Sequence, residues 1–131
     1  MKSSFTKILD NSYNINDTEE LELFNINGYF PKEIFKLENL RILKLKGSGL
    51  IGSIPTEIGN LKKLNHLDLS NNKLEGPIPI SICSLDKIWY IDLTKNCLSG
   101  LIAEQFFDFI SRKKLPINNI VSGNQLKINI S

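Results

Sequence analysis

Leucine and isoleucine recur along this chain at a fixed spacing. Three consecutive blocks of 24 residues, 37–60, 61–84 and 85–108, align without a gap and carry apolar side chains at the same five places. These side chains are Leu37, Leu40, Leu43, Leu45 and Leu50, then Leu61, Leu64, Leu67, Leu69 and Leu74, then Leu85, Ile88, Ile91, Leu93 and Leu98. A period of about 20–50 residues is typical of a protein built from stacked coils that share one core. The pattern therefore predicts a solenoid.

Each block also predicts the path of one coil. Two apolar residues separated by one residue, such as Leu67 and Leu69, alternate with the period of a short strand that buries one face. Asn72 follows three residues later, where the chain leaves the strand and a buried amide can satisfy backbone groups. Asn96 and Asn124 are the turn residues of later coils, and Ser48 stands at this place in an earlier one. A glycine and an Ile-Pro pair then favour a tight bend and an extended crossover.

Residues 61–82, LKKLNHLDLSNNKLEGPIPISI, carry leucines, asparagine, glycine and Ile-Pro in one register. This segment resembles the plant-type, 24-residue leucine-rich repeat, the kind found in receptor-like kinases, receptor-like proteins and polygalacturonase inhibitors. The resemblance covers residues 37–108 closely and about 19–131 loosely. It implies an α/β fold, a right-handed solenoid of four or five coils. A short parallel sheet then lines the concave face, and extended or helical crossovers form the convex side.

The chain departs from this pattern at both ends. The coil at 21–36 is two residues short, because Leu23 and Gly28 are five residues apart where Leu45 and Gly52 are seven apart. In the block at 85–108 the proline is missing, and four residues there predict an amphipathic helix at 102–113 because they are spaced i, i+3, i+4 and i+7. These four are Ala103, Phe106, Phe107 and Ile110. Asn124 lies 28 residues after Asn96, which leaves four extra residues for a helical crossover.

We expect one domain over residues 1–131, with a capping segment at 1–18, repeats at 19–108 and an irregular, shortened last repeat at 109–131. The paired cysteines of the family's N-terminal cap are missing. In their place Phe5, Ile8 and Leu9 predict one short capping helix after Ser3 or Ser4.

Charge and composition narrow the function. A net charge of +2 predicts no nucleic-acid partner, since phosphate binding needs concentrated basic surface. No segment approaches the roughly 20 apolar residues of a membrane span, so direct membrane insertion is not expected. The N-terminus lacks the apolar run of a signal peptide, whereas the family resemblance suggests an extracellular or cell-surface location; the compartment stays open.

Cys83 and Cys97 occupy different places in the repeat and are expected to be free, and Asn16 and Asn129 begin glycosylation sequons.

Residues that flank the inward leucines are expected to project from the concave face, where equivalent residues of neighbouring coils lie about 4.8 Å apart. Tryptophan, tyrosine and arginine are enriched in binding hot spots, although scattered exposed aromatic residues are also ordinary surface. Asp68 and Asp92, beside Lys44, match the repeat consensus and are expected to serve the scaffold. The predicted partner-binding residues are Arg41, Ile42, Lys44, Lys46, Asn65, His66, Trp89 and Tyr90.

No catalytic constellation accompanies the single histidine, His66, since no nucleophile is placed around it. No metal site or cofactor is expected. The sequence therefore predicts a non-enzymatic interaction module for a protein or peptide ligand, either a monomer or part of a longer array. Two alternatives stay open: a structural or capping fragment of a larger leucine-rich-repeat receptor, and an inhibitor of a secreted wall-degrading enzyme.

Overall fold

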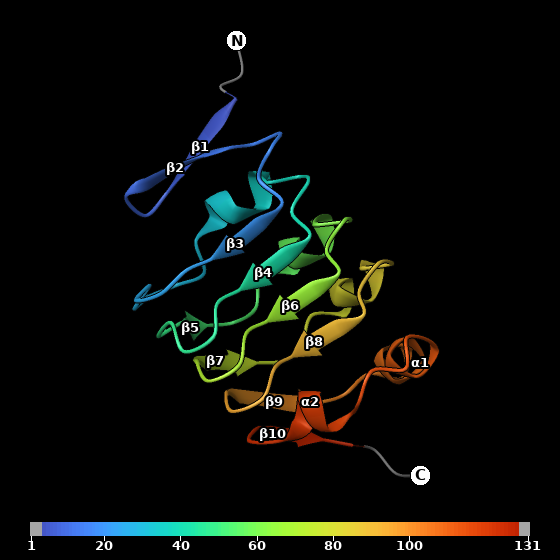
Figure 1. Cartoon of the computed structure of the whole chain (residues 1–131). Helices are drawn as coiled ribbons and strands as arrows, with labels where there is room; N and C mark the ends of the chain where they lie inside the picture. The colour runs from blue at the N-terminus through green and yellow to red at the C-terminus, as the bar shows by residue number, and fades with distance from the viewer. Residues whose placement is uncertain (1–3, 129–131) are drawn as a thin grey trace.

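The computed structural model describes residues 4–128, and within them the chain winds into stacked coils with two parallel sheets (Figure 1). The main sheet has the order β3-β4-β6-β8, and its neighbours along the sheet come from consecutive coils. Its strands are β3 (Glu20–Glu22), β4 (Ile42–Lys44), β6 (His66–Asp68) and β8 (Tyr90–Asp92). The second sheet has the order β10-β9-β7-β5 and is formed by the segments that follow the turn residues Ser48, Asn72, Asn96 and Asn124. Its strands are β5 (Ile51–Gly52), β7 (Lys73–Gly76), β9 (Cys97–Leu101) and β10 (Gln125–Lys127).

Short 3-10 helices return the chain from the second sheet to the main sheet. They are η1 (Lys32–Lys36), η2 (Thr56–Asn60) and η3 (Ile80–Ser84), and each begins after a proline in the extended conformation. Each helix buries one isoleucine, Ile34, Ile58 or Ile82, against the leucines of its coil. At Gly59 the backbones of η2 and η3 come so close that an added Cβ would lie 2.6 Å from the carbonyl oxygen of Ser81.

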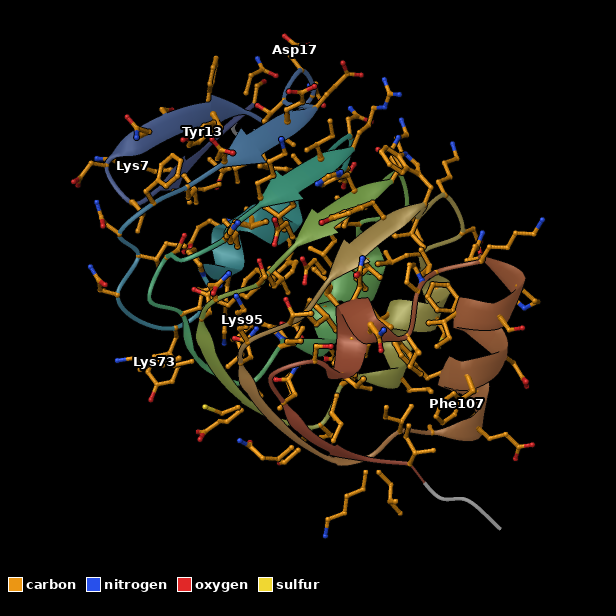
Figure 2. The ribbon with its side chains drawn as sticks, turned by 60° about the horizontal axis from the view of Figure 1, so that its bottom comes forward. Lys7, Tyr13, Asp17, Lys73, Lys95 and Phe107 are labelled. Atoms are coloured by element: carbon orange, nitrogen blue, oxygen red, sulfur yellow. The ribbon has the colours of Figure 1, made fainter. Side chains whose placement is uncertain are left out.

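The predicted helical crossover is confirmed as α1 (Glu104–Arg112). Its buried side differs from the predicted set, because Phe106, Phe109 and Ile110 face the core while Ala103 is exposed and Phe107 is half-buried. Phe109 is only 1% exposed, since residues three and four apart share one helix face and the helix starts after Ala103. Figure 2 shows Phe107 on α1, at the end of the molecule opposite to Tyr13.

The turn asparagines form a ladder of hydrogen bonds inside the solenoid. The Asn72 Oδ1 accepts hydrogen bonds from the backbone N–H groups of Ser48 (2.9 Å) and Leu50 (3.0 Å). Its Nδ2 donates to the carbonyl oxygens of Leu45, Leu69 and Ser70. Asn96 and Asn124 play the same role one and two coils later, each accepting from one backbone N–H group and donating to backbone carbonyl oxygens. Ser48, at the equivalent place, donates its hydroxyl to the carbonyl oxygen of Leu23.

The expected N-terminal capping helix is wrong, because residues 5–14 form an antiparallel hairpin. β1 (Phe5–Ile8) pairs with β2 (Asn11–Asn14), and Thr6 and Ile8 are buried while Phe5 and Leu9 are exposed. This alternation has the period of a strand. Leu9 adopts a φ of 56° in the tight turn, which closes the hairpin. Ser3 lies outside the described residues.

The last coil lacks a main-sheet strand within residues 4–128. The short helix α2 (Asn118–Val121) packs beside β8 instead, and the carbonyl oxygen of Asn119 accepts a hydrogen bond from the N–H of Leu93 (2.8 Å). β10 then rejoins the second sheet beside β9. Among the described residues, no helix has the length and apolar character needed to cross a membrane.

Candidate functional site

The parallel register of the main sheet aligns its outward side chains in columns. Ile42 pairs with His66 and His66 with Tyr90, so equivalent residues of neighbouring coils form a first column, as the repeat predicts. The second column begins at Glu22 and runs through Lys44 and Asp68 to Asp92. The side chains thus come together because strands of three residues stack in register, 22 residues apart between β3 and β4 and 24 residues apart in the later coils.

Three rings from two neighbouring strands form an aromatic cluster, defined here as His66, Trp89 and Tyr90. His66 stacks on Tyr90 with ring centroids 4.3 Å apart and an interplanar angle of 17°. Trp89 meets both rings edge-on, at 5.7 Å from His66 and 6.2 Å from Tyr90. The Trp89 side chain is 63% exposed, so a large apolar ring is presented to solvent beside two half-buried ones.

The two aspartates of the neighbouring column are held by their own strands. Asp68 Oδ1 accepts hydrogen bonds from the backbone N–H (3.0 Å) and hydroxyl (2.6 Å) of Ser70. Asp92 Oδ1 accepts the same two bonds from Thr94, at 2.9 and 2.6 Å. These bonds support the expected scaffold role of Asp68 and Asp92. They use only one oxygen of each carboxylate, and the Asp92 Oδ2 accepts a longer bond of 3.4 Å from the Tyr90 hydroxyl.

Burial and nearby charges keep this cluster uncharged near neutral pH. Partial burial lowers the pKa of His66, and the ammonium of Lys44 lowers it further, while Asp68 acts in the opposite direction. Burial also raises the pKa of Tyr90, and the carboxylates of Asp92 and Asp68 add to this shift. The imidazole is therefore neutral at pH 7 and the phenol stays protonated.

The other predicted residues lie around this cluster. The carbonyl oxygen of Arg41 accepts hydrogen bonds from the N–H groups of Asn65 and His66, and Asn65 relates in the same way to Trp89 and Tyr90. The side chains of Arg41, Lys44 and Lys46 are exposed, whereas Asn65 and Ile42 are half-buried.

Sequence reasoning missed Phe24, which is 62% exposed. Phe24 follows Leu23 as Lys46 follows Leu45, and the equivalent residues of the next two coils are Ser70 and Thr94. The sequence did contain a signal for Phe24, because this position is apolar in the first coil and polar in the other coils. Phe24 extends the candidate surface toward the N-terminal coil.

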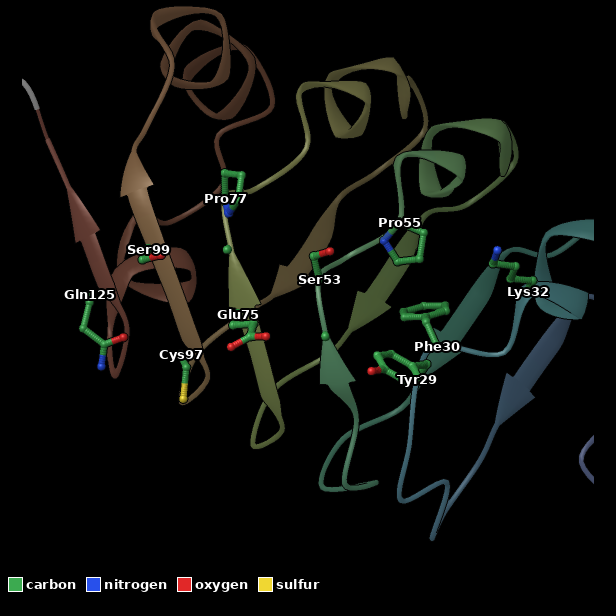
Figure 3. A pocket seen from close by; sticks show the side chains of 12 residues that line it. Tyr29, Phe30, Lys32, Ser53, Pro55, Glu75, Pro77, Cys97, Ser99 and Gln125 are labelled. Atoms are coloured by element: carbon green, nitrogen blue, oxygen red, sulfur yellow. The ribbon is translucent and has the colours of Figure 1, made fainter.

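A hollow lies on the second sheet, outside the predicted residues (Figure 3). It is open, has a volume of about 940 Å³ and has Gly52 and Gly76 among its lining residues. The Tyr29 ring lies against Gly52, where an added Cβ would be 2.8 Å from the Tyr29 Cδ1, and the Tyr29 side chain is 75% exposed. Glu75 projects from β7 beside it. Only the folded coils bring Tyr29 and Gly52 together.

The described residues contain no group of three or more histidine, cysteine, aspartate or glutamate side chains that could hold a metal ion. Cys83 and Cys97 are free. Burial raises the pKa of the Cys83 thiol, which keeps that sulfur protonated at neutral pH.

A family model described as a leucine-rich repeat matches residues 38–98. Residues 38–98 of this chain are leucine-rich repeats. Its repeats, its two parallel sheets and its asparagine ladder agree with that family. A search of the curated proteins finds no match.

Several solved structures are similar to this leucine-rich-repeat chain. The ectodomain of the Arabidopsis thaliana membrane receptor kinase GASSHO1/SCHENGEN3, in complex with CASPARIAN STRIP INTEGRITY FACTOR 2, is 33% identical over 77% of this chain and 12% of that chain, with a TM-score of 0.65. The plant peptide hormone receptor RGFR1, in complex with RGF2, is 36% identical over 76% of this chain and 15% of that chain (TM-score 0.63). A plant ice-binding protein is 35% identical over 82% of this chain and 34% of that chain (TM-score 0.72). The leucine-rich-repeat chain therefore spans between 12% and 34% of the length of these three structures.

Proposed function

We propose that this chain is a non-enzymatic interaction module that binds a protein or peptide through the outer face of its main sheet. The observation that carries the proposal is the aromatic cluster, in which the 63% exposed Trp89 meets the stacked His66 and Tyr90. Rigid aromatic rings supply a large contact area at low cost in conformational entropy, and they anchor many interfaces.

The position of the cluster supports this proposal. The inward leucines fill the core and the asparagine ladder holds the turns, so the three rings of the aromatic cluster have no comparable structural role. Exposed Lys44, Lys46 and Arg41 surround the rings. Such rim charges act mainly on association rate and salt dependence.

The similar receptor structures also support a protein or peptide partner, since both were solved in complex with a bound factor or hormone. The similar ice-binding protein shows that this fold serves other functions as well. The proposal therefore rests on the residues of the main-sheet face, because the fold alone does not specify the function.

The size of the face limits the affinity. Four strands about 4.8 Å apart span roughly 15–20 Å, which gives roughly a few hundred Å² of contact, against about 800 Å² per partner in a standard interface. Weak binding by the chain alone, or a role within a longer array of repeats, fits this area. The two receptor structures solved with a bound factor or hormone are longer arrays, of which this chain spans 12% and 15%.

A selection of random 12-residue peptides displayed on phage, with the immobilised chain as bait, tests the proposal. Binding of the selected peptides is then measured by isothermal titration calorimetry to the wild type, to the double variant Trp89→Ala/Tyr90→Ala, and to Tyr29→Ala. Tyr29 is the matched control, because it is an exposed aromatic residue on the second sheet. We expect the double variant to lose at least tenfold in affinity and Tyr29→Ala to bind as the wild type does. Selected peptides that bind a folded double variant as tightly as the wild type would move the site away from the main sheet.

A further inference from the structure

Two carboxylates face the solvent side by side on the main sheet. Asp68 on β6 and Asp92 on β8 are paired in register, so their strands are about 4.8 Å apart. Within residues 4–128 neither carboxylate forms an ion pair with a basic side chain. Like charges on neighbouring strands repel each other, so a positive group placed between them would be attracted by both.

The carboxylates are also preorganised. The Oδ1 atoms are fixed by the backbone and hydroxyl groups of Ser70 and Thr94. This leaves the two Oδ2 atoms as acceptors, of which only that of Asp92 has a partner in the described chain, the Tyr90 hydroxyl at 3.4 Å. Acceptors that are already oriented lose little conformational entropy when a ligand binds.

The aromatic cluster borders this pair of carboxylates. Tyr90 is on β8 two residues before Asp92; its hydroxyl donates to that carboxylate and its ring stacks on His66. Trp89 presents its exposed ring next to Tyr90. Carboxylates that adjoin aromatic rings match the guanidinium group, which is planar, stacks on rings and donates several hydrogen bonds in a fixed fork. A lysine ammonium matches the charge but not the plane.

We propose that the main-sheet face recognises an arginine side chain of its partner, with the guanidinium held between Asp68 and Asp92 and stacked beside Tyr90 and Trp89. This inference rests on the proposed function and names the chemistry of the partner, an extended peptide segment that contains arginine. The charges on the face also predict how the charges of the partner are arranged along it. The β6–β8 half of the face is acidic, and Lys44 and Arg41 make the β4 half basic, so acidic residues of the partner lie toward β4.

The same peptide selection tests this inference. Arginine should be enriched at one place in the selected 12-residue peptides. Replacing that arginine with citrulline, which keeps the shape and removes the charge, should weaken binding to the wild type at least tenfold. Replacing it with lysine should have a smaller effect. The loss on citrulline substitution should largely disappear in the double variant Asp68→Asn/Asp92→Asn, which keeps an acceptor for Ser70 and Thr94.

The control variant is Asp86→Asn, an exposed aspartate outside the main sheet; it should leave the citrulline effect unchanged. Peptides that need Trp89 and Tyr90 but show no arginine preference would overturn this inference and leave the proposed function standing. Peptides whose loss of affinity on citrulline substitution is the same in Asp68→Asn/Asp92→Asn as in the wild type would also overturn it. Peptides that bind independently of Trp89 and Tyr90 would contradict the proposed function itself.

Discussion

The imidazole of His66 stacks on the phenol ring of Tyr90, and this contact joins β6 to β8 on the outer face of the main sheet. The stack buries part of each ring, which moves the pKa of His66 downward and that of Tyr90 upward. Both shifts favour the uncharged forms. The face consequently offers neutral rings next to charged side chains.

The first prediction concerns the titration of His66. Because burial and Lys44 lower the folded-state pKa of His66, the NMR midpoint of its ring protons should lie below the reference value of about 6.5. Lys44→Ala should raise the midpoint and Asp68→Asn should lower it further, since these groups act with opposite signs. Protonation favours the unfolded state, so the contribution of His66 to stability is present above about pH 6.5 and declines as the pH falls. A midpoint at or above the reference value would contradict the described environment.

The second prediction concerns the asparagine ladder. Asn72→Ala removes the partners of two backbone N–H groups and three carbonyl oxygens. We expect a loss of about 1–3 kcal/mol in the free energy of unfolding, measured by urea denaturation, because buried backbone groups become unsatisfied. Lys73→Ala is the control, since Lys73 is the exposed neighbour in sequence. Equal losses in the two variants would refute the structural role of the ladder.

The third prediction distinguishes two phenylalanines of α1. Phe106 is 2% exposed and Phe107 is half-buried. Phe106→Ala should lower the free energy of unfolding by about 3–5 kcal/mol, because it removes a full ring from the core. Phe107→Ala should have a clearly smaller effect. The reverse order in chemical denaturation would place the wrong face of α1 against the core.

The fourth prediction concerns the contact between η2 and η3. Gly59→Ala would bring a Cβ to 2.6 Å from the carbonyl oxygen of Ser81, so the two crossovers must separate. We expect a loss of about 1–3 kcal/mol, as for other overpacked positions. Gly28→Ala is the matched control, because the nearest atom to an added Cβ there is 3.8 Å away. If both substitutions lower the midpoint of thermal unfolding equally, the coils can move apart freely and the close contact at Gly59 has no special cost.

The sequence predicted the repeat, the columns and the asparagine ladder because all three follow from one period. A 24-residue spacing places Ile42, His66 and Tyr90 in register without any knowledge of the loops. The N-terminal hairpin was not predicted, since the apolar residues Phe5, Ile8 and Leu9 have helical spacing. The strand instead buries Ile8 and a polar residue, Thr6. The positive φ of Leu9, which closes the hairpin, is a property of the folded chain and has no signal in the sequence.

The candidate site, too, could be predicted from the sequence only in part. The aromatic residues were identified from their places in the repeat, but their stacking distances depend on side-chain rotamers that the spacing does not specify. At one end of the hollow on the second sheet, the Tyr29 ring lies against Gly52. Such a contact between residues 23 positions apart has no local signature in the sequence.

The position of α2 beside β8 has a consequence for how a partner can bind. A sheet edge normally exposes backbone donors and acceptors to which a foreign strand can be added. At β8 the following segment covers that edge, and Asn119 already accepts the hydrogen bond of Leu93. Strand addition is thereby blocked on this side, which protects the sheet from edge-to-edge aggregation. A partner at this end must recognise side chains, and its sequence then matters more than its ability to form a strand.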